Sequence, residues 1–205
     1  MLIDQAAPDF TCLACMPDNS FQEVTLSSYK GKYVIVFFWP ADFTFVCASE
    51  VPGFNKLLPE FQKRGCEILG VSTDTHHAHK GWKLLPKELG GLGCDIQYPM
   101  IGDKTKEIAA AYDVLQGDGL CARGVFLIDK EGIVRAESKN CDPLGRNLDE
   151  PLRLLDALQF HEKSIAEGKK QVCPAQWKLG KKGLTPTMEG VGEFNKEGGV
   201  DNYIA

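Results

Sequence analysis

The sequence predicts an α/β fold with a mixed central sheet, helices on both faces and an extended C-terminal tail. Apolar runs of strand length alternate with segments of helical periodicity in the first half of the chain. Two further apolar runs joined by a charged turn then form a hairpin, and a long amphipathic helix follows. Because this order combines strand–helix–strand units with a hairpin, it indicates a mixed sheet.

The first predicted strand and helix enclose the most informative part of the chain. The stretch KYVIVFFW, Lys32–Trp39, is short, rich in β-branched and aromatic residues, and apolar on both faces. These properties are typical of a buried central strand. A helix is expected over Glu50–Gly65, because its apolar residues recur at helical spacing and a glycine ends it.

The remaining elements follow in order along the chain. A second strand over Cys66–Asp74 runs into a turn, and the pattern then predicts two helices, a hairpin and a long helix (Thr75–Gly91, Thr105–Val114, Gly124–Ser138 and Leu148–Gly168). The complete order resembles the thioredoxin-like arrangement.

Past Gly168 the composition shifts to lysine, glycine and proline, with little apolar periodicity. We therefore expect a folded domain over residues 1–168 and a tail over residues 169–205. The tail is expected to wrap a surface or a partner subunit and to have no core of its own.

Composition restricts the classes of protein to which the chain can belong. A net charge of −5 argues against a nucleic-acid binder, which usually carries a basic stripe. No stretch approaches the roughly 20 apolar residues that cross a membrane, and the first residues lack the pattern of a signal peptide. A cytoplasmic location is therefore predicted, where eight cysteines favour redox or metal roles over a disulfide framework.

Cys47 stands in FFWPADFTFVCASE, where the apolar strand breaks at Pro40 and a helix begins. One interpretation is packing, because free cysteine is a common small core residue. The other is chemistry, because the unpaired N–H groups and dipole of a helix N-terminus stabilise a thiolate. Thr44 can hydrogen-bond at the same turn, and Pro40 would help to shield the pocket from water. Arg123, at the start of a predicted strand, could supply a cation that favours the thiolate.

The pattern Pro-x-x-x-Thr-x-x-Cys, with glutamate three positions on, resembles the active-site signature of the peroxiredoxins. The blocks GVSTDTHHAHKGW, YPMIGD, ARGVFLIDKEGIV, GRNLDEPLRLLDALQF and VCPAQW are similar to a typical two-cysteine peroxiredoxin of the alkyl hydroperoxide reductase type. The resemblance implies that Cys47 attacks a peroxide oxygen and becomes sulfenic acid. It also implies that Pro40, Thr44 and Arg123 complete the pocket of a peroxidase domain over residues 1–168.

The same resemblance assigns supporting residues. Glu50 is expected to orient an arginine, and Arg146 in GRNLDE matches a second arginine of the family. Ala48 departs from the family, which usually has proline after the reactive cysteine. Because proline suits the start of a helix, alanine should cost some rigidity there, but we expect activity to survive.

Cys173, in QVCPAQW, lies in the predicted tail. It could be an incidental surface cysteine, but its surroundings resemble the resolving-cysteine segment of the family. The resemblance implies a Cys47–Cys173 disulfide between two subunits, reset by thioredoxin or a disulfide reductase flavoprotein. It further implies hydrogen peroxide and small organic hydroperoxides as substrates, a homodimer that assembles into a ring of five dimers, and no need for a metal, flavin or haem.

The other cysteines are assigned to packing. Cys12 and Cys15 form a C-x-x-C that could be a redox pair or half a zinc site, but the segment reads as strand then turn, which would point the two side chains to opposite faces. The other four have no motif of their own (Cys66, Cys94, Cys121 and Cys141).

Three histidines could imitate a metal cluster (His76, His77 and His79), with Asp74 the only nearby carboxylate. A solvated helix start is the preferred interpretation of this group, although His79 with Trp82 also matches a packing block of the family. The sequence therefore predicts no metal site.

Two other classes of function compete with a peroxidase. A redox-controlled holdase chaperone or a peroxide sensor could use the same scaffold, but a pure holdase would not need both Cys47 and Cys173. A general disulfide oxidoreductase of thioredoxin type is disfavoured, because Cys47 has no second cysteine three residues away.

Overall fold

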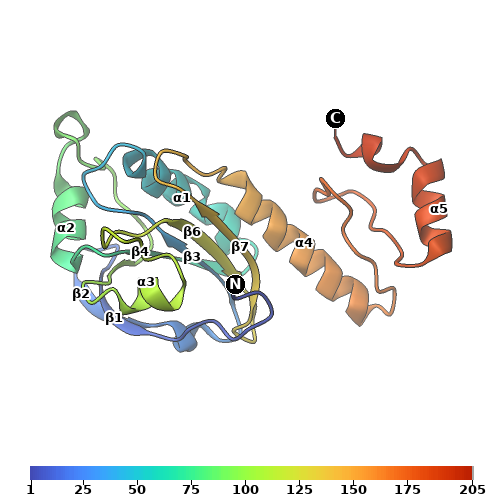
Figure 1. The fold of residues 1–205 in the computed structure, drawn as a ribbon, viewed down its shortest axis with the longest axis horizontal. Helices are drawn as coiled ribbons and strands as arrows, with labels where there is room; N and C mark the ends of the chain where they lie inside the picture. The colour runs from blue at the N-terminus through green and yellow to red at the C-terminus, as the bar shows by residue number, and fades with distance from the viewer. Residues whose placement is uncertain (205) are drawn as a thin grey trace. The chain divides into compact units, whose positions relative to one another are not determined.

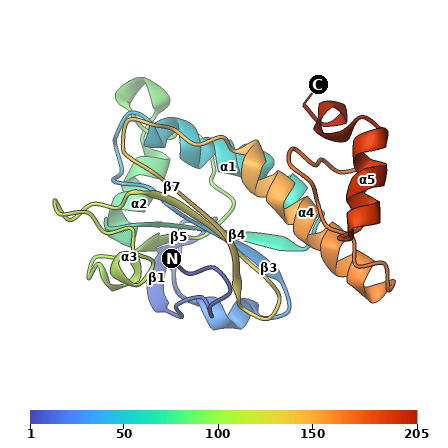
Figure 2. The same ribbon diagram turned by 45° about the vertical axis from the view of Figure 1, so that its right-hand side comes forward.

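A single mixed sheet organises the N-terminal part of the computed structural model, which describes residues 1–204. Within those residues the sheet has seven strands in the order β2-β1-β5-β4-β3-β6-β7 (Figure 1, Figure 2). Their bounds are Thr11–Cys15, Phe21–Thr25, Tyr33–Phe38, Cys66–Ser72, Met100–Gly102, Arg123–Ile128 and Val134–Asn140 for β1 to β7. β3 pairs in parallel with β4 and antiparallel with β6, so it is a buried interior strand of the sheet, as its apolar sequence predicted.

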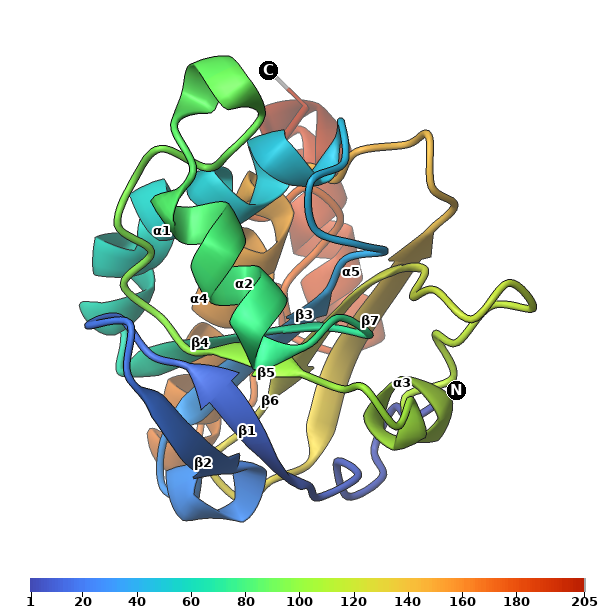
Figure 3. The ribbon, with the colours of Figure 1, turned by 90° about the vertical axis from the view of Figure 1, so that its left-hand side faces the viewer.

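Helices cover both faces of this sheet. Figure 3 shows α1 (Cys47–Gln62) and α2 (His76–Leu84) on one side of the strands and α3 (Glu107–Ala111) on the other. The connections β3–α1–β4 and β4–α2–β5 each join parallel strands, and such connections are almost always right-handed. Since both run in the same direction across the sheet, α1 and α2 lie on the same face. The predicted mixed sheet with helices on both faces is confirmed.

The two faces of β3 pack into different layers. Val34, Val36 and Phe38 belong to the apolar cluster that also contains Tyr112, which follows α3. Phe37 lies on the opposite face and stacks on Phe54 of α1, with ring centroids 4.1 Å apart. Alternation along a strand sends neighbouring side chains to opposite faces, so burial on both sides requires the continuous apolar run.

Several predicted elements are shorter in the structure. α2 ends at Leu84 and does not reach Gly91, because proline disfavours the helical conformation of the residue before it, and Leu85 before Pro86 is extended with ψ 133°. α3 has five residues and starts after Lys106, whose φ of 66° lies in the left-handed region. β2 and β5 were not predicted, since each is short and lacks a long apolar run.

The chain divides into two compact units, residues 1–148 and residues 149–205. The second unit contains α4 (Asp149–Ala166), α5 (Met188–Lys196) and an irregular segment that doubles back between them (Figure 2). α4 therefore groups with the tail, whereas the sequence placed a domain boundary after residue 168. That boundary stays a prediction, and Ala205 lies outside the described residues.

The predicted tail is more structured than expected. Its composition gave no sign of α5, and Trp177 is completely buried. The Trp177 ring lies 4.8 Å from that of Phe160 on α4, and the main-chain oxygen of Trp177 accepts a hydrogen bond from Arg153. The tail thus buries its tryptophan against α4, and only part of it is extended.

Candidate active site

Cys47 is the first residue of α1, and its side chain is completely buried. β3 ends at Phe38 because Pro40 has no N–H for the sheet, and the chain crosses to α1 through residues 39–46. The sulfur therefore lies where helix N–H groups and the helix dipole favour negative charge. This is the position that the sequence predicted for it.

Arg123 brings a cation to that sulfur. Its Nη1 atom donates to Cys47 Sγ at 3.3 Å and to Glu50 Oε2 at 2.7 Å, and its Nε donates to the main-chain oxygen of Asp142 at 2.7 Å. Arg123 is the first residue of β6, next to β3, so the antiparallel pairing places it near the end of β3 where α1 begins. Burial alone opposes its charge, but the contacts with Cys47 and Glu50 raise the pKa of Arg123.

Glu50 joins two arginines. One of its oxygens accepts from both the main-chain N–H and Nε of Arg146, each at 2.9 Å, and the other accepts from Arg146 Nη2 at 2.8 Å. Arg146 Nη1 donates to the main-chain oxygens of Phe38 and Gly124, at 2.7 and 2.8 Å, at the end of β3 and the start of β6. Burial lowers the pKa of Arg146, which Glu50 opposes. The result is a buried Arg–Glu–Arg cluster that fixes the guanidinium beside the thiol.

Pro40 and Thr44 lie in the loop before the helix. Pro40 is buried, and the Thr44 hydroxyl donates to the main-chain oxygen of Ala41 at 2.7 Å. The main-chain oxygen of Thr44 accepts from the N–H of Ala48 at 3.3 Å, so this threonine also closes the first turn of α1. The structure therefore brings Pro40, Thr44 and Arg123 to the segment around Cys47.

Cys173 lies in the second unit, between α4 and α5. Its thiol is half-buried and lies 3.5 Å from the main-chain oxygen of Ala157. Burial raises the pKa of Cys173, and the positive charge of Arg153 opposes that shift. At neutral pH it is therefore held mainly as the thiol.

Burial raises the pKa of five of the six remaining thiols (Cys12, Cys15, Cys66, Cys94 and Cys121). Burial raises the pKa of Cys66 and of Cys121 to about 12. Cys12 is half-buried and lies 3.3 Å from the main-chain oxygen of Gly102, while Cys15 is buried and lies near the main-chain oxygen of Met16. Cys94 is partly buried, and Cys141 is exposed. All eight thiols are free in this structure.

The histidine group corrects one expectation. His77 is exposed, but His79 has no exposed surface, so a solvated helix start is the wrong description for it. The reason is its partners: the His79 ring contacts Asp42 at 2.7 Å and the main-chain oxygen of Ile101 at 3.1 Å. Trp82 is also buried, in agreement with the packing interpretation. In the described part of the chain no group of three or more histidine, cysteine or acidic side chains has the geometry of a metal site.

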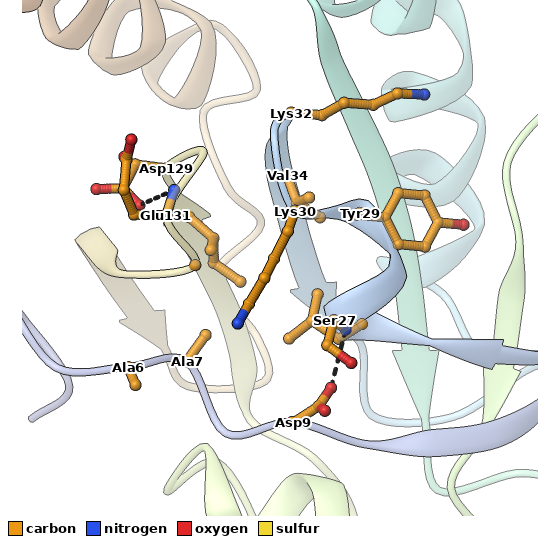
Figure 4. Close-up of a pocket in the computed structure, with 13 residues that line it drawn as sticks. Ala6, Ala7, Asp9, Ser27, Tyr29, Lys30, Lys32, Val34, Asp129 and Glu131 are labelled. Carbon is orange, nitrogen blue, oxygen red and sulfur yellow. Dashed lines mark hydrogen bonds between the residues drawn. The ribbon is translucent and has the colours of Figure 1, made fainter.

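A separate hollow of about 210 Å³ lies at the other end of β3. Figure 4 shows it between the N-terminal segment at Ala7, the helical turn at Ser27 and the hairpin turn at Asp129, with the Lys30 side chain extended across it. Its walls are partly apolar, and they include none of the predicted site residues. The hollow is therefore distinct from the thiol site.

Sequence reasoning missed two groups of the site. Asp42 is buried among Trp39, His79 and the loop before α1. The sequence marks it only as an acidic residue that lies between the aromatic residues Trp39 and Phe43. The main-chain oxygen of Asp142 accepts from Arg123, but a backbone contact leaves no mark in the sequence.

Comparison with known proteins agrees with this geometry. Residues 3–137 match the AhpC/TSA family, and residues 157–197 match the C-terminal domain of 1-Cys peroxiredoxin. The chain is 44% identical to peroxiredoxin-1 of Gallus gallus over 193 residues, 94% of each chain. It is also 44% identical to alkyl hydroperoxide reductase C of Helicobacter pylori over 202 residues, 98% of this chain and 99% of that protein.

A solved structure is similar over nearly the whole length. The reduced 2-Cys peroxiredoxin of Plasmodium vivax has a TM-score of 0.90 and 41% identity, with 96% of this chain and 99% of that chain covered. The sheet, together with a thiol at the start of a helix, places the protein in the thioredoxin-like class. The similarities to known proteins then define its family within that class. The chain belongs to the AhpC/TSA family and is a peroxiredoxin. Among the described residues, no helix is long and apolar enough to span a membrane.

Proposed function

We propose that this protein is a thiol-dependent peroxidase that reduces hydrogen peroxide and small organic hydroperoxides. The observation that carries the proposal is the placement of Cys47 Sγ at the start of α1, buried and 3.3 Å from the guanidinium of Arg123. A helix N-terminus and a fixed cation together favour the thiolate, which is the nucleophile in peroxide chemistry. The names of the relatives, which include peroxiredoxins and an alkyl hydroperoxide reductase, support the same activity.

In the first step the Cys47 thiolate attacks one oxygen of the peroxide. The S–O bond forms as the O–O bond breaks, and the departing oxygen takes a proton and leaves as water or an alcohol. Cys47 becomes sulfenic acid, a two-electron oxidation that balances the reduction of the peroxide. Arg123 would stabilise charge on the reacting oxygens, while Glu50 and Arg146 hold it in place. Pro40 and Thr44 would shape the pocket.

In the second step Cys173 of a partner protomer attacks the oxidised sulfur. An S–S bond forms, the S–O bond breaks, and hydroxide leaves with a proton as water. Because Cys47 is completely buried, the first turn of α1 must open before the two sulfurs can meet. An external dithiol then reduces the disulfide.

The finer assignments rest on the family. We infer a homodimer, five of which form a ring, and a reductant that is either thioredoxin or a disulfide reductase flavoprotein. One relative is named a thioredoxin-dependent peroxide reductase, which supports the first reductant. The cytoplasmic location stays a prediction from the sequence.

The decisive experiment is a disulfide map after one equivalent of hydrogen peroxide per protomer, with free thiols alkylated and the protein digested without reduction. An interchain Cys47–Cys173 peptide is the expected product. Sulfenic or sulfinic Cys47 with a free Cys173 would instead indicate a one-cysteine peroxidase or a sensor. An unmodified Cys47 would overturn the proposed activity.

A further inference from the structure

The loop before Cys47 is held by a buried polar network that the reaction scheme does not use. Asp42 accepts from the indole Nε1 of Trp39 at 3.0 Å, and its other carboxylate oxygen lies 2.7 Å from His79 Nδ1. The N–H of Asp42 donates to Asp74 at 2.8 Å. The single residue Asp42 thus ties its loop to Trp39 at the end of β3, to the turn after β4 and to α2.

The residue after Asp42 shows what the network holds. Phe43 has a φ of 57°, in the left-handed region that non-glycine residues rarely adopt. Strained backbone of this kind persists only where neighbouring contacts impose it, and it gathers at functional sites. Thr44 comes next, and its main-chain oxygen closes the first turn of the helix that begins at Cys47. The turn at Phe43 therefore sets the path of the chain into the site.

The contacts of His79 require an additional proton. Both ring nitrogens face oxygen: Nδ1 faces the Asp42 carboxylate, and Nε2 faces the main-chain oxygen of Ile101 at 3.1 Å. A neutral imidazole has only one N–H, so with an ionised Asp42 it could make only one of these bonds. One more proton, on the ring or on the carboxylate, satisfies both. Burial also raises the pKa of Asp42, against the opposing charge of His79.

We propose that Asp42 and His79 share a buried proton and act as positioning residues, holding the left-handed turn at Phe43 so that Thr44 and Cys47 are placed for peroxide reduction. This inference rests on the proposed role of Cys47 as the reacting thiol. The pair keeps its full set of bonds while it holds the proton and loses one bond when the proton leaves. The contribution of the pair to the reaction rate is therefore present at lower pH and lost as pH rises.

Other titratable groups near the pair come from each packed element. Asp74 follows β4, His76 begins α2, and Cys15 ends β1. A substitution at residue 42 leaves these three groups in place. Their effects on the rate constant therefore largely cancel when the rate constant of the variant is divided by that of the protein with Asp42 at the same pH.

The isosteric variant Asp42→Asn reverses the proton requirement. The asparagine Nδ2 can donate to His79 Nδ1, its oxygen can accept from Trp39, and the neutral ring can donate to Ile101. All three bonds then form without the additional proton. In this variant low pH is unfavourable, because a proton on His79 Nδ1 would point toward the amide N–H of the asparagine and prevent the hydrogen bond between them.

The experiment measures Cys47 sulfenic acid formation by hydrogen peroxide in a Cys173→Ser background, at intervals from about pH 5 to about pH 8. The rate constant of Asp42→Asn divided by that of the unsubstituted residue 42 is expected to rise with pH. Asp42→Ala is expected to lower the rate constant on the order of 100-fold, as misplaced catalytic groups do. The matched control His77→Asn, on the same helix but exposed, should change it by no more than about twofold.

A ratio that stays flat with pH would overturn the inference, and so would an Asp42→Asn protein that fails to fold, because its hydrogen bonds would then not replace the shared proton. If Asp42→Ala fails to fold, the ratio for Asp42→Asn still decides. A Cys47 that does not react with peroxide even with Asp42 and His79 intact would overturn the proposed function itself. If Cys47 reacts with peroxide but the ratio of rate constants does not change with pH, only the positioning role of Asp42 and His79 is overturned.

Discussion

Glu50 is the residue on which the charge balance of the site depends. It lies between two buried guanidinium groups, and it accepts from Arg123 and from Arg146 at 2.7 to 2.9 Å. Buried charges are tolerated only when they are paired and hydrogen-bonded. Glu50 therefore permits a cation beside Cys47 in an interior where an isolated arginine would be unfavourable.

We expect Glu50→Gln to lower the free energy of unfolding by about 3 kcal/mol, since removing one partner of a buried pair leaves its charge uncompensated. The peroxide rate constant should fall with it, because Arg123 loses its support. Urea unfolding and single-turnover oxidation measure the two effects. The control is Glu60→Gln on the same helix, where exposed ion pairs with Lys63 and Arg64 contribute little because water screens them. Equal losses in the two variants would contradict the bridging role.

Cys173 gives a prediction for pH dependence. Burial raises the pKa of its thiol above the ordinary value, so the thiolate is scarce at neutral pH. The rate of disulfide formation after Cys47 oxidation should rise with pH, by about tenfold per unit below that pKa. Arg153→Gln removes the opposing charge and should slow the step at neutral pH, whereas Arg153→Lys should not. Quenched samples on non-reducing gels give the rate, and a pH-independent rate would count against Cys173 as the attacking thiol.

At the scale of elements, the start of α1 decides how easily the reactive turn opens. The N–H of Ala48 donates to Thr44 across 3.3 Å, a long bond that a proline at this position could not make. Proline would in return fix a helical φ at the start of the helix.

Because these effects oppose each other and the lost bond is worth at most about 1 kcal/mol, Ala48→Pro should change the peroxide rate constant only a few-fold. Stopped-flow measurement with hydrogen peroxide tests this expectation, with Ala48→Ser as the control that keeps the N–H. A large increase would mean that alanine leaves the site short of its best geometry.

The end of α2 is a second place where local structure is tightly constrained. The chain turns sharply after Pro86, and a Cβ on Gly91 would clash with the main-chain oxygen of Leu85. Gly91→Ala should therefore lower the free energy of unfolding by about 1–3 kcal/mol, as overpacking does. Gly117→Ala meets nothing within 4 Å and serves as the control in the same thermal unfolding experiment. An unchanged midpoint for Gly91→Ala would mean that the turn can rearrange.

At the scale of the whole molecule, the two proposed thiols belong to different compact units, Cys47 to residues 1–148 and Cys173 to residues 149–205. The second unit anchors its irregular segment on α4 through Trp177, and Cys173 lies four residues before that tryptophan. A disulfide between protomers would therefore join the first unit of one chain to the second unit of another.

Mixed protomers test this directly. Cys47→Ser and Cys173→Ser chains with different tags are refolded together and treated with hydrogen peroxide. An interchain disulfide between the two tags is expected in the mixture and in neither variant alone. The bond should persist when Cys141, the exposed thiol, is also replaced by serine. If the disulfide forms within one chain, the mixture will show no cross-link.

The sequence by itself determined the central strand, the helix start at Cys47 and the family, because long apolar runs and a dense local motif reflect interactions between near neighbours. It also indicated Arg123, Glu50 and Arg146, through resemblance alone in the case of Glu50 and Arg146. Only the tertiary structure decided that Glu50 bridges both arginines, that Asp142 supplies a main-chain acceptor and that His79 is buried against Asp42. These contacts join residues 19 to 96 positions apart, so no local periodicity could specify them. The short strands β2 and β5, and the α5 helix of the tail, likewise depend on pairing and packing with distant segments, which is why composition did not predict them.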